Sequence, residues 1–164
     1  MKAFASVFFA FLFLLYADFA VAKQPVQWSN TSPSISLIHI FQGQINRSGK
    51  PTGFHHIDIL RTPPPKATRL QKILSTPNKT GVYTAIIEIW DAKTRQWKTK
   101  FSSMFPNRFS KEKVIQTILY AFKNNKLKNG RKWRGRSGNG FEIEGYLLKD
   151  GRIITAYPIY KVGE

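Results

Sequence analysis

The chain has 164 residues, with 26 Lys and Arg against 9 Asp and Glu, so its formal net charge is +17. A hydrophobic content of 42% and an aromatic content of 14% exclude a disordered polycation, and the length suits one domain. Cysteine is absent, which excludes disulfides, cysteine-based zinc sites and a thiol nucleophile. Solubility requires a much smaller charge, so we expect a polyanionic partner: nucleic acid, an anionic membrane surface or an acidic polysaccharide.

The N-terminus is typical of a cleavable secretory signal peptide. Lys2 precedes the apolar run of residues 3–17, and the small residues Ala20-Val21-Ala22 form a cleavage site. The run is shorter than the roughly 20 residues that a membrane-spanning helix needs, although an uncleaved anchor is the alternative. The predicted organisation is a signal peptide, a polar leader and a folded domain, over residues 1–22, 23–34 and 35–164. We therefore expect a secreted or periplasmic protein, cut after Ala22, with no stable membrane insertion after cleavage.

The first half of the folded domain is predicted to contain strands and long connections. Apolar runs rich in β-branched residues predict strands over residues 35–41 and 54–60. Residues 42–53 between them are rich in Gly, Asn and Pro and predict a turn-rich connection. Residues 61–81 include three consecutive prolines and predict a long loop.

The second half contains the clearer signals. Strands are predicted over residues 82–90, 96–102, 141–148 and 152–157. Ser110 is a suitable N-cap for a helix whose apolar residues recur at helical spacing over residues 114–122. The turn Lys149-Asp150-Gly151 joins the last two strands as a hairpin, and Pro158 ends the last strand. The predicted fold class is α+β: a single compact domain with a mainly antiparallel sheet and a packed helix.

Histidine is concentrated in one short stretch, because His39, His55 and His56 are the only histidines of the chain. Two imidazoles that face each other across a phosphate can cleave RNA without a metal: one takes the proton of the 2′-hydroxyl and the other protonates the leaving 5′-oxygen. A lysine then stabilises the charge on the phosphorane. Histidine suits both roles because its ordinary pKa lies near 6.5. Structural histidines, or a metal site of His55, His56 and Asp58, are the alternatives.

A family resemblance supports the catalytic interpretation. The motifs that carry it are His39-Ile40-Phe41-Gln42-Gly43, Gly53-Phe54-His55, Lys100 before Ser102-Ser103-Met104-Phe105-Pro106, Trp133-Arg134-Gly135, Gly145-Tyr146 and Ile153-Ile154-Thr155-Ala156-Tyr157-Pro158. In this order, over residues 35–160, the chain resembles the bacterial EndoU toxin domain of the EndoU-like endoribonucleases. The resemblance implies the barnase-EndoU-colicin-RelE-like architecture.

The resemblance also implies roles for particular residues. His39 and His55 become the acid/base pair, without settling which takes which proton. His56 is expected on the opposite face of the strand, as a substitute in substrate binding. The catalytic lysine falls on Lys98 or Lys100, which share a strand face, and the spacing to the following Phe-Pro favours Lys100. Lys98 is then expected to bind substrate.

Thr155 and Tyr157 also share a strand face, and the resemblance makes them substrate-binding residues. The threonine hydroxyl can bond a uracil edge and the tyrosine ring can stack on base or ribose, whereas the alternative is an ordinary strand pair. The implied activity is cleavage at uridylates, with tRNA as a candidate substrate, to a 2′,3′-cyclic phosphate. The resemblance implies that no metal is required and that Mn²⁺ can stimulate the activity. The implied role is that of a toxin or effector, with a cognate immunity or inhibitor protein as partner.

Bacterial members of the family usually end a larger delivery protein, whereas this domain is expected to stand alone behind the predicted signal peptide. Two other function classes remain open. The first is a non-catalytic cationic protein that binds nucleic acid or an anionic surface. The second is a membrane-active antimicrobial protein. The basic segment of residues 123–136, with Trp133 among its charges, serves either as a phosphate-binding flank or as a solvated charge run. The sequence makes no prediction of the oligomeric state.

Overall fold

The computed structural model describes residues 28–57 and 67–163, and only the backbone of residues 126–129. The predicted signal peptide lies outside the described residues. The part of the predicted leader that is described packs on the domain, because Trp28 forms a β-bridge with Ser36 and the backbone N–H of Ile35 donates to the Ser29 hydroxyl at 2.8 Å. No helix in the described part of the chain has the length and apolar character needed to cross a membrane.

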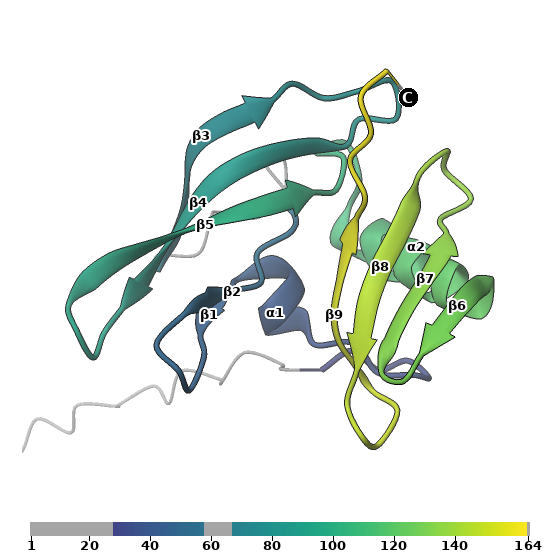
Figure 1. Ribbon diagram of the computed structural model, residues 1–164, viewed down its shortest axis with the longest axis horizontal. Helices are drawn as coiled ribbons and strands as arrows, with labels where there is room; N and C mark the ends of the chain where they lie inside the picture. The colour runs from purple at the N-terminus through teal and green to yellow at the C-terminus, as the bar shows by residue number, and fades with distance from the viewer. Residues whose placement is uncertain (1–27, 58–66, 164) are drawn as a thin grey trace, which may run out of the picture.

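Two antiparallel sheets form the body of the domain (Figure 1). The three-stranded sheet has the order β3-β4-β5, and its strands are Thr68–Ser75, Tyr83–Asp91 and Gln96–Met104. The four-stranded sheet has the order β6-β7-β8-β9, and its strands are Asn125–Asn129, Lys132–Arg136, Glu142–Leu147 and Ile153–Pro158. A small hairpin pairs β1 (Gln44–Ile45) with β2 (Pro51–Thr52). This α+β architecture with antiparallel sheets confirms the predicted fold class.

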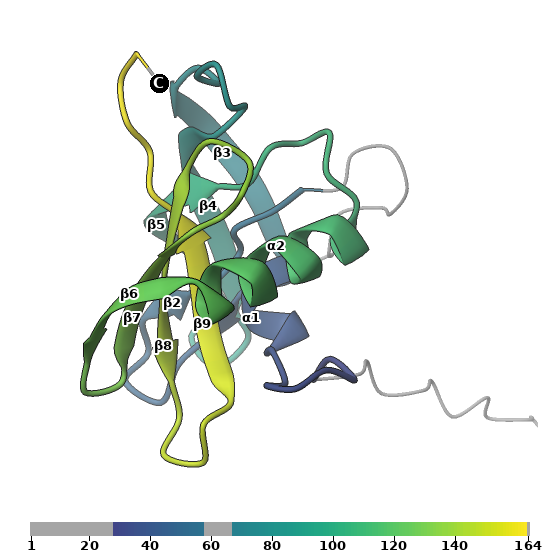
Figure 2. The same cartoon turned by 90° about the vertical axis from the view of Figure 1, so that its right-hand side faces the viewer.

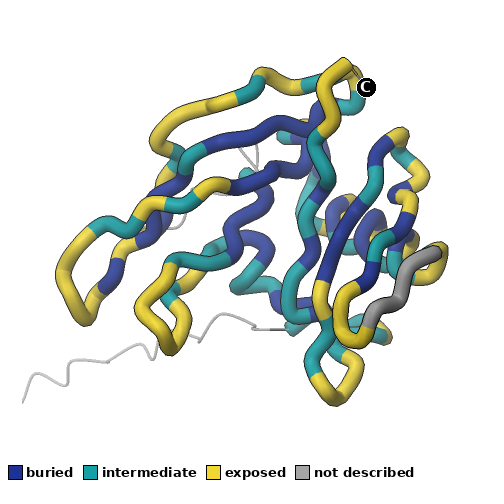
Figure 3. The backbone as a smooth tube through the Cα atoms, in the orientation of Figure 1, coloured by how far each residue is buried: buried dark blue, intermediate teal, exposed yellow. Residues whose placement is uncertain are grey.

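Each sheet has its own hydrophobic core. Helix α2 (Lys111–Lys123) lies across the four-stranded sheet (Figure 2), where its buried Val114 and Ile118 pack in one cluster with Trp133 of β7. The second cluster joins Ile87 of β4 to Phe54, beneath the three-stranded sheet. The strand centres and the helix face that packs on the sheet are buried, while the hairpin tips are exposed (Figure 3). The boundary between the two sheets therefore lies between two hydrophobic cores that pack separately.

Helix α2 follows the sequence prediction closely. The Ser110 hydroxyl accepts a hydrogen bond from the backbone N–H of Lys113, which satisfies one of the unpaired donors of the first turn. Such a cap contributes about 1 kcal/mol to helix stability. The helix ends at Lys123, with Asn124 as its C-cap, where the apolar spacing stops. The strands β4, β5, β8 and β9 are confirmed as well, with bounds that differ by one or two residues.

The predictions for the first half of the domain are wrong in three places. Within the first predicted strand, residues 37–41 form a helix instead, α1 (Leu37–Phe41), because the Ser36 hydroxyl caps it by accepting from the His39 N–H, and Ile40 and Phe41 become buried. Residues 54–57 belong to no strand, and residues 58–60 of the same prediction lie outside the described residues. The predicted loop at 61–81 contains β3. This edge strand has mostly exposed side chains, so its sequence does not alternate between apolar and polar residues.

The basic segment of residues 123–136 is mostly a β-hairpin, formed by β6 and β7. Trp133, which the sequence placed among the charges, is 1% exposed and belongs to the core. Gly135 lies within β7 against the carbonyl oxygen of Ala121, so its lack of a side chain lets helix and sheet approach closely. Arg131, Lys132 and Arg136 are exposed, which leaves a basic rim on the outer side of this sheet.

Candidate active site

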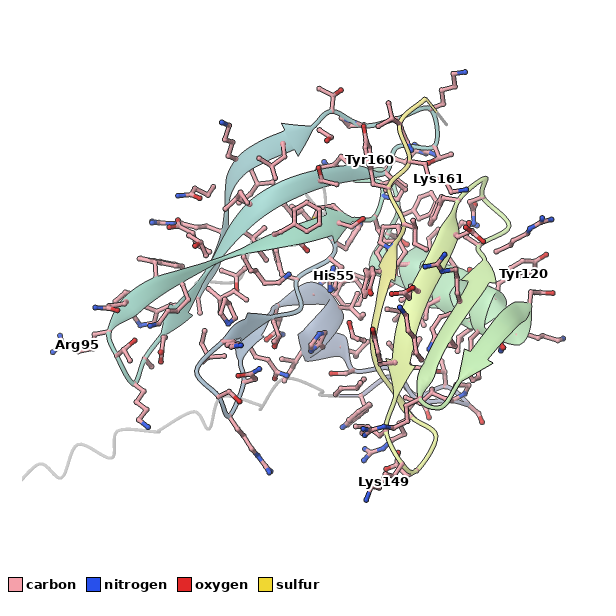
Figure 4. The ribbon with its side chains drawn as sticks, in the orientation of Figure 1. His55, Arg95, Tyr120, Lys149, Tyr160 and Lys161 are labelled. Carbon is pink, nitrogen blue, oxygen red and sulfur yellow. The ribbon has the colours of Figure 1, made fainter. Side chains whose placement is uncertain are left out.

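A cleft of about 500 Å³ opens where β5, β9 and the segment that follows β2 come together. It brings together five of the residues that the sequence singled out, namely His39, His55, Lys100, Thr155 and Tyr157. These residues come from α1, the segment after β2, β5 and β9, which are far apart in the sequence. His55 lies near the middle of the molecule, between α1 and the edge of the three-stranded sheet (Figure 4).

The segment of residues 53–55 is tied to helix α1 by its backbone. The N–H of Phe54 donates to the carbonyl of His39 at 2.7 Å, and the N–H of His55 donates to the carbonyl of Ile40 at 2.8 Å. Gly53 and Phe54 both have positive φ, at 77° and 61°, a conformation that is uncommon for a phenylalanine. This turn brings the chain so close to α1 that two backbone hydrogen bonds link the segments that carry His39 and His55.

The environment of His55 selects one tautomer of its ring. Its Nδ1 lies 3.0 Å from the carbonyl oxygen of Ser103, which can only accept, so Nδ1 carries the proton. The Ser102 hydroxyl donates to the Phe54 carbonyl at 2.7 Å and lies 3.1 Å from the same ring nitrogen. Burial first, and then the charge of Lys100, hold the pKa of His55 well below 6.5. His55 is therefore neutral at physiological pH, with Nε2 as the nitrogen that can accept a proton.

His39 faces the same cleft from α1. Its ring centroid lies 6.2 Å from that of His55, with the two planes inclined by 30°. The side-chain nitrogen of Gln44 lies 3.5 Å from Nδ1 of His39. Burial, and to a lesser degree the charge of Lys100, lower the pKa of His39 to about 4. The two imidazoles thus form a close pair whose members differ in exposure and in hydrogen bonding.

Lys100 is the lysine of the cleft. Its Nζ donates to the Gly53 carbonyl at 3.0 Å, and burial lowers its pKa to about 8. At neutral pH the ammonium group is mostly charged and keeps further N–H donors for a ligand. Lys98 lies two residues earlier on the same strand and is not among the residues that line the cleft. Of the two lysines, the one that the sequence favours is therefore the one that lines the cleft.

Thr155 and Tyr157 enter the cleft from one face of β9, as their spacing predicts. The Tyr157 ring lies 5.4 Å from the ring of His55, and its hydroxyl donates to Glu144 at 2.6 Å. Burial and this hydrogen bond raise the pKa of Tyr157. The Thr155 hydroxyl is buried and has no hydrogen-bond partner among the described residues. An unpaired buried hydroxyl in a cleft is suited to bond a ligand.

Glu144 is a supporting residue that the sequence reasoning missed. Besides the Tyr157 hydroxyl, its carboxylate binds Lys132 at 3.0 Å and Arg134 at 2.7 Å. Burial alone would raise the pKa of Glu144, but the hydrogen bonds from Tyr157, Arg134 and Lys132 outweigh it and lower that pKa. The strand alternation that puts Glu144 and Tyr157 opposite each other in β8 and β9 was the available signal. Ser102 and Ser103, which contact Nδ1 of His55, belong to a family motif, but their sequence gave no sign of this role.

His56 does not line the cleft. It is 2% exposed, and its ring meets Phe41 edge-on at 5.8 Å. Neighbouring side chains in an extended segment point in opposite directions, so the prediction that His56 faces away from His55 is compatible with this placement. Within residues 28–57 and 67–163, no group of three or more His, Cys, Asp or Glu side chains could hold a metal ion. Asp58 of the alternative metal site lies outside the described residues.

Replacing Lys100 by methionine is expected to raise the pKa of His39 from about 4 part of the way toward 6.5. The ammonium charge is the second cause of the low value and is removed by this change, while burial, the larger cause, remains. The pKa of His55 should rise in the same direction. NMR titration of the ring Cε1–H signals measures both. The matched control is Lys98→Met, which removes the same charge from the same strand outside the cleft; equal shifts in the two variants would contradict the proximity of Lys100.

Comparison with known proteins shows the family of this chain. The family model described as Bacterial EndoU nuclease matches residues 35–160. A Bacillus cereus protein named "Toxin" is 30% identical over 123 residues, which is 75% of this chain and 22% of the relative, so the chain spans about a fifth of that protein's length. No solved structure matches the chain. The matched residues contain every side chain that lines the cleft, and the chain belongs to the bacterial EndoU nuclease family.

Proposed function

We propose that the protein is an endoribonuclease that cleaves RNA at uridylates by general acid/base transesterification and leaves a 2′,3′-cyclic phosphate. The observation that carries this proposal is a pair of imidazoles, 6.2 Å apart, beside a half-buried lysine in one cleft. A phosphodiester that enters the cleft would meet a proton acceptor, a proton donor and a positive charge. Attack by the 2′-hydroxyl on the adjacent phosphorus requires these three groups.

His55 is assigned as the general base. Its Nδ1–H donates to the Ser103 carbonyl, so Nε2 is free to take the proton of the 2′-hydroxyl. A pKa below 6.5 keeps the ring neutral before the reaction. The carbonyl that receives the Nδ1–H also stabilises the imidazolium that forms.

His39 is assigned as the general acid and Lys100 as the electrostatic stabiliser. His39 is the more exposed of the two rings, and an anionic phosphate beside it offsets the charge of Lys100 and raises the pKa of His39 in the complex. It then protonates the 5′-oxygen that leaves. The ammonium group of Lys100 offers its remaining N–H donors to the non-bridging oxygens, on which charge builds in the phosphorane.

Thr155 and Tyr157 are assigned to substrate recognition. The unpaired Thr155 hydroxyl supplies one hydrogen bond to a uracil edge. The ring of Tyr157 is held by Glu144 through its hydroxyl, so its face is available to the base or ribose. A hydrogen bond at a base edge selects among bases, whereas stacking does not.

The biological setting is part of the proposal. The name "Toxin" of the Bacillus cereus relative supports a role as a toxin or effector, and a cell that makes such an enzyme needs a cognate inhibitor protein. The predicted signal peptide supports action outside the producer's cytoplasm. tRNA is the candidate RNA. This mechanism uses two imidazoles and an ammonium group and requires no metal.

The test is cleavage of a single-stranded RNA that contains one uridine by the purified protein in EDTA. The expected product carries a 2′,3′-cyclic phosphate at that uridine, identified by mass spectrometry, and a matched RNA without uridine stays intact. Parallel reactions with Mn²⁺ separate stimulation from dependence. Binding without cleavage, with or without Mn²⁺, would overturn the proposal in favour of a non-catalytic cationic binder.

A further inference from the structure

The three-stranded sheet has one buried face and one solvent-facing face. Directly opposite residues of antiparallel strands point to the same side. Ala85, Ile87 and Ile89 of β4 are 0–2% exposed and pack in the core, and Lys100 stands opposite Ile87 on that side. The residues between them point the other way. On β5 and β4 these are the pairs Trp97 with Trp90, Thr99 with Glu88, and Phe101 with Ile86.

The solvent-facing side carries large aromatic side chains that are exposed. Phe101 is 58% and Trp90 is 36% exposed, and Thr99 between Trp97 and Phe101 is exposed as well. The rings of Trp90 and Trp97 meet at 5.4 Å. A sheet side of this kind costs free energy in water unless a partner covers it. We call Arg69, Trp90, Trp97, Thr99 and Phe101 the aromatic face.

Arg69 of β3 adds a fixed positive plane to this surface. Its guanidinium lies 4.1 Å from the centre of the Trp97 ring, and its Nε donates to Glu88 at 2.6 Å. The side chain is nevertheless 55% exposed. The ion pair and the ring therefore hold the guanidinium at this surface while more than half of the side chain stays exposed. Bases stack on arginine planes as they do on aromatic rings.

The aromatic face is continuous with the cleft. Phe101 belongs to both, because it lines the cleft beside Lys100 and stands on the same side of β5 as Trp97. Trp97 lies four residues earlier, about 13 Å along the strand. In Figure 4 the sheet runs from the region of His55 toward Arg95 at the tip of the β4–β5 hairpin, and this is the direction from Phe101 to Trp97. A strand bound in the cleft can leave it over Phe101.

We propose that the aromatic face is an extended binding site for unpaired RNA nucleotides that flank the cleaved bond. The inference rests on the proposed function of the cleft and adds to it a preference for single-stranded substrates long enough to reach the sheet. Rings and guanidinium planes stack on bases of any sequence, and Arg69 together with the net charge of +17 favours a polyanion. Only unpaired bases expose the faces that such a surface binds, so duplex RNA would not use it.

The first experiment compares two substrates, the dinucleotide UpA and a 12-nucleotide single-stranded RNA with one central uridine. The Trp97→Ala variant is expected to lower kcat/KM for the 12-mer about tenfold through KM, with the loss confined to that substrate, as removal of a stacked base predicts. The control is Tyr120→Ala, which removes an aromatic side chain that is 53% exposed on α2, on the far side of the molecule from Arg95 (Figure 4). Equal losses for both substrates, or none for the 12-mer, would overturn the proposal.

A second variant avoids any effect on folding from the loss of a large ring. Thr99→Glu places a carboxylate between Trp97 and Phe101 and should repel the RNA strand. Gln116→Glu adds the same charge to an exposed position of α2 and should have no effect. Cleavage of the 12-mer is expected to fall severalfold in the first variant alone.

A binding measurement separates this proposal from the proposed function. The probe is the 12-mer with 2′-deoxyuridine at its centre, which has no attacking hydroxyl, and tryptophan fluorescence reports binding. We expect quenching on binding, and about tenfold weaker binding by Trp97→Ala. If the wild type cleaves neither substrate but binds the 12-mer more tightly than Trp97→Ala does, the proposed function is wrong and the aromatic face is still an RNA-binding site. Unchanged affinity in both Trp97→Ala and Thr99→Glu would refute the RNA site and assign the face to a protein partner.

Discussion

Replacing either His39 or His55 by alanine is expected to lower the rate of RNA cleavage by about 10²–10⁴, the range for loss of a positioned general acid or base. The two losses should not add, because both groups act in the same transition state. The affinity of these variants for the 12-mer with a central 2′-deoxyuridine should change far less than their cleavage rate. Single-turnover cleavage in EDTA measures the rate without interference from product release.

A more conservative variant separates chemistry from folding at His55. Asparagine places a donor nitrogen close to the position of Nδ1 and can keep the hydrogen bond to the Ser103 carbonyl, but it has no counterpart of Nε2. His55→Asn should therefore retain the thermal stability of the wild type and still lose cleavage. Undiminished cleavage in the alanine variants of both histidines would contradict the assignment, and the cleft would then be a binding site only.

The elements with strong periodicity could be predicted from the sequence. Helix α2 shows apolar residues at helical spacing behind a serine cap, and β8 and β9 alternate around the turn at residues 149–151. Such patterns are local, and the tertiary structure preserves them. Thr155 and Tyr157 were paired for the same reason, since a spacing of two residues on a strand gives one face.

Helix α1 and strand β3 show where local patterns fail. A short apolar run fits a strand and a buried helix equally well, and the Ser36 cap with the burial of Ile40 decides for a helix. Strand β3 carries exposed apolar side chains at Ile73 and Leu74, because it lies at an edge and has register shifts, so alternation is lost. Nothing in its own residues indicates that it pairs with β4.

The candidate active site likewise has features that the sequence predicts and features that depend on tertiary contacts. The ordered motifs located the histidines, but their approach depends on hydrogen bonds between the backbone of residues 54–55 and α1. Spacing to the following Phe-Pro favours Lys100 over Lys98, but the support of Tyr157 by Glu144 depends on register and on packing between strands. The aromatic face likewise requires knowing that Trp90 stands opposite Trp97. These are long-range facts, which composition and spacing do not contain.

Gly53→Ala is expected to damage the site from a position that carries no catalytic group. Gly53 has a φ of 77°, and a Cβ there would overlap the carbonyl oxygen of His39. That oxygen accepts from Phe54, and the carbonyl of Gly53 accepts from Lys100, so relief of the overlap moves three parts of the site at once. Misplacement by about 1 Å can cost 10²-fold in rate, and we expect at least that loss in kcat/KM.

The matched control for this variant is Gly49→Ala. Gly49 has nearly the same φ, 73°, but a Cβ there meets nothing within 4 Å. It should therefore carry only the backbone strain of a left-handed alanine, about 1–2 kcal/mol of unfolding free energy, and keep its activity. Gly53→Ala should lose more stability in urea unfolding, together with its cleavage. Equal stability and equal activity in the two variants would show that the close approach of the residue 53–55 segment to α1 does not hold His39 and His55 in register.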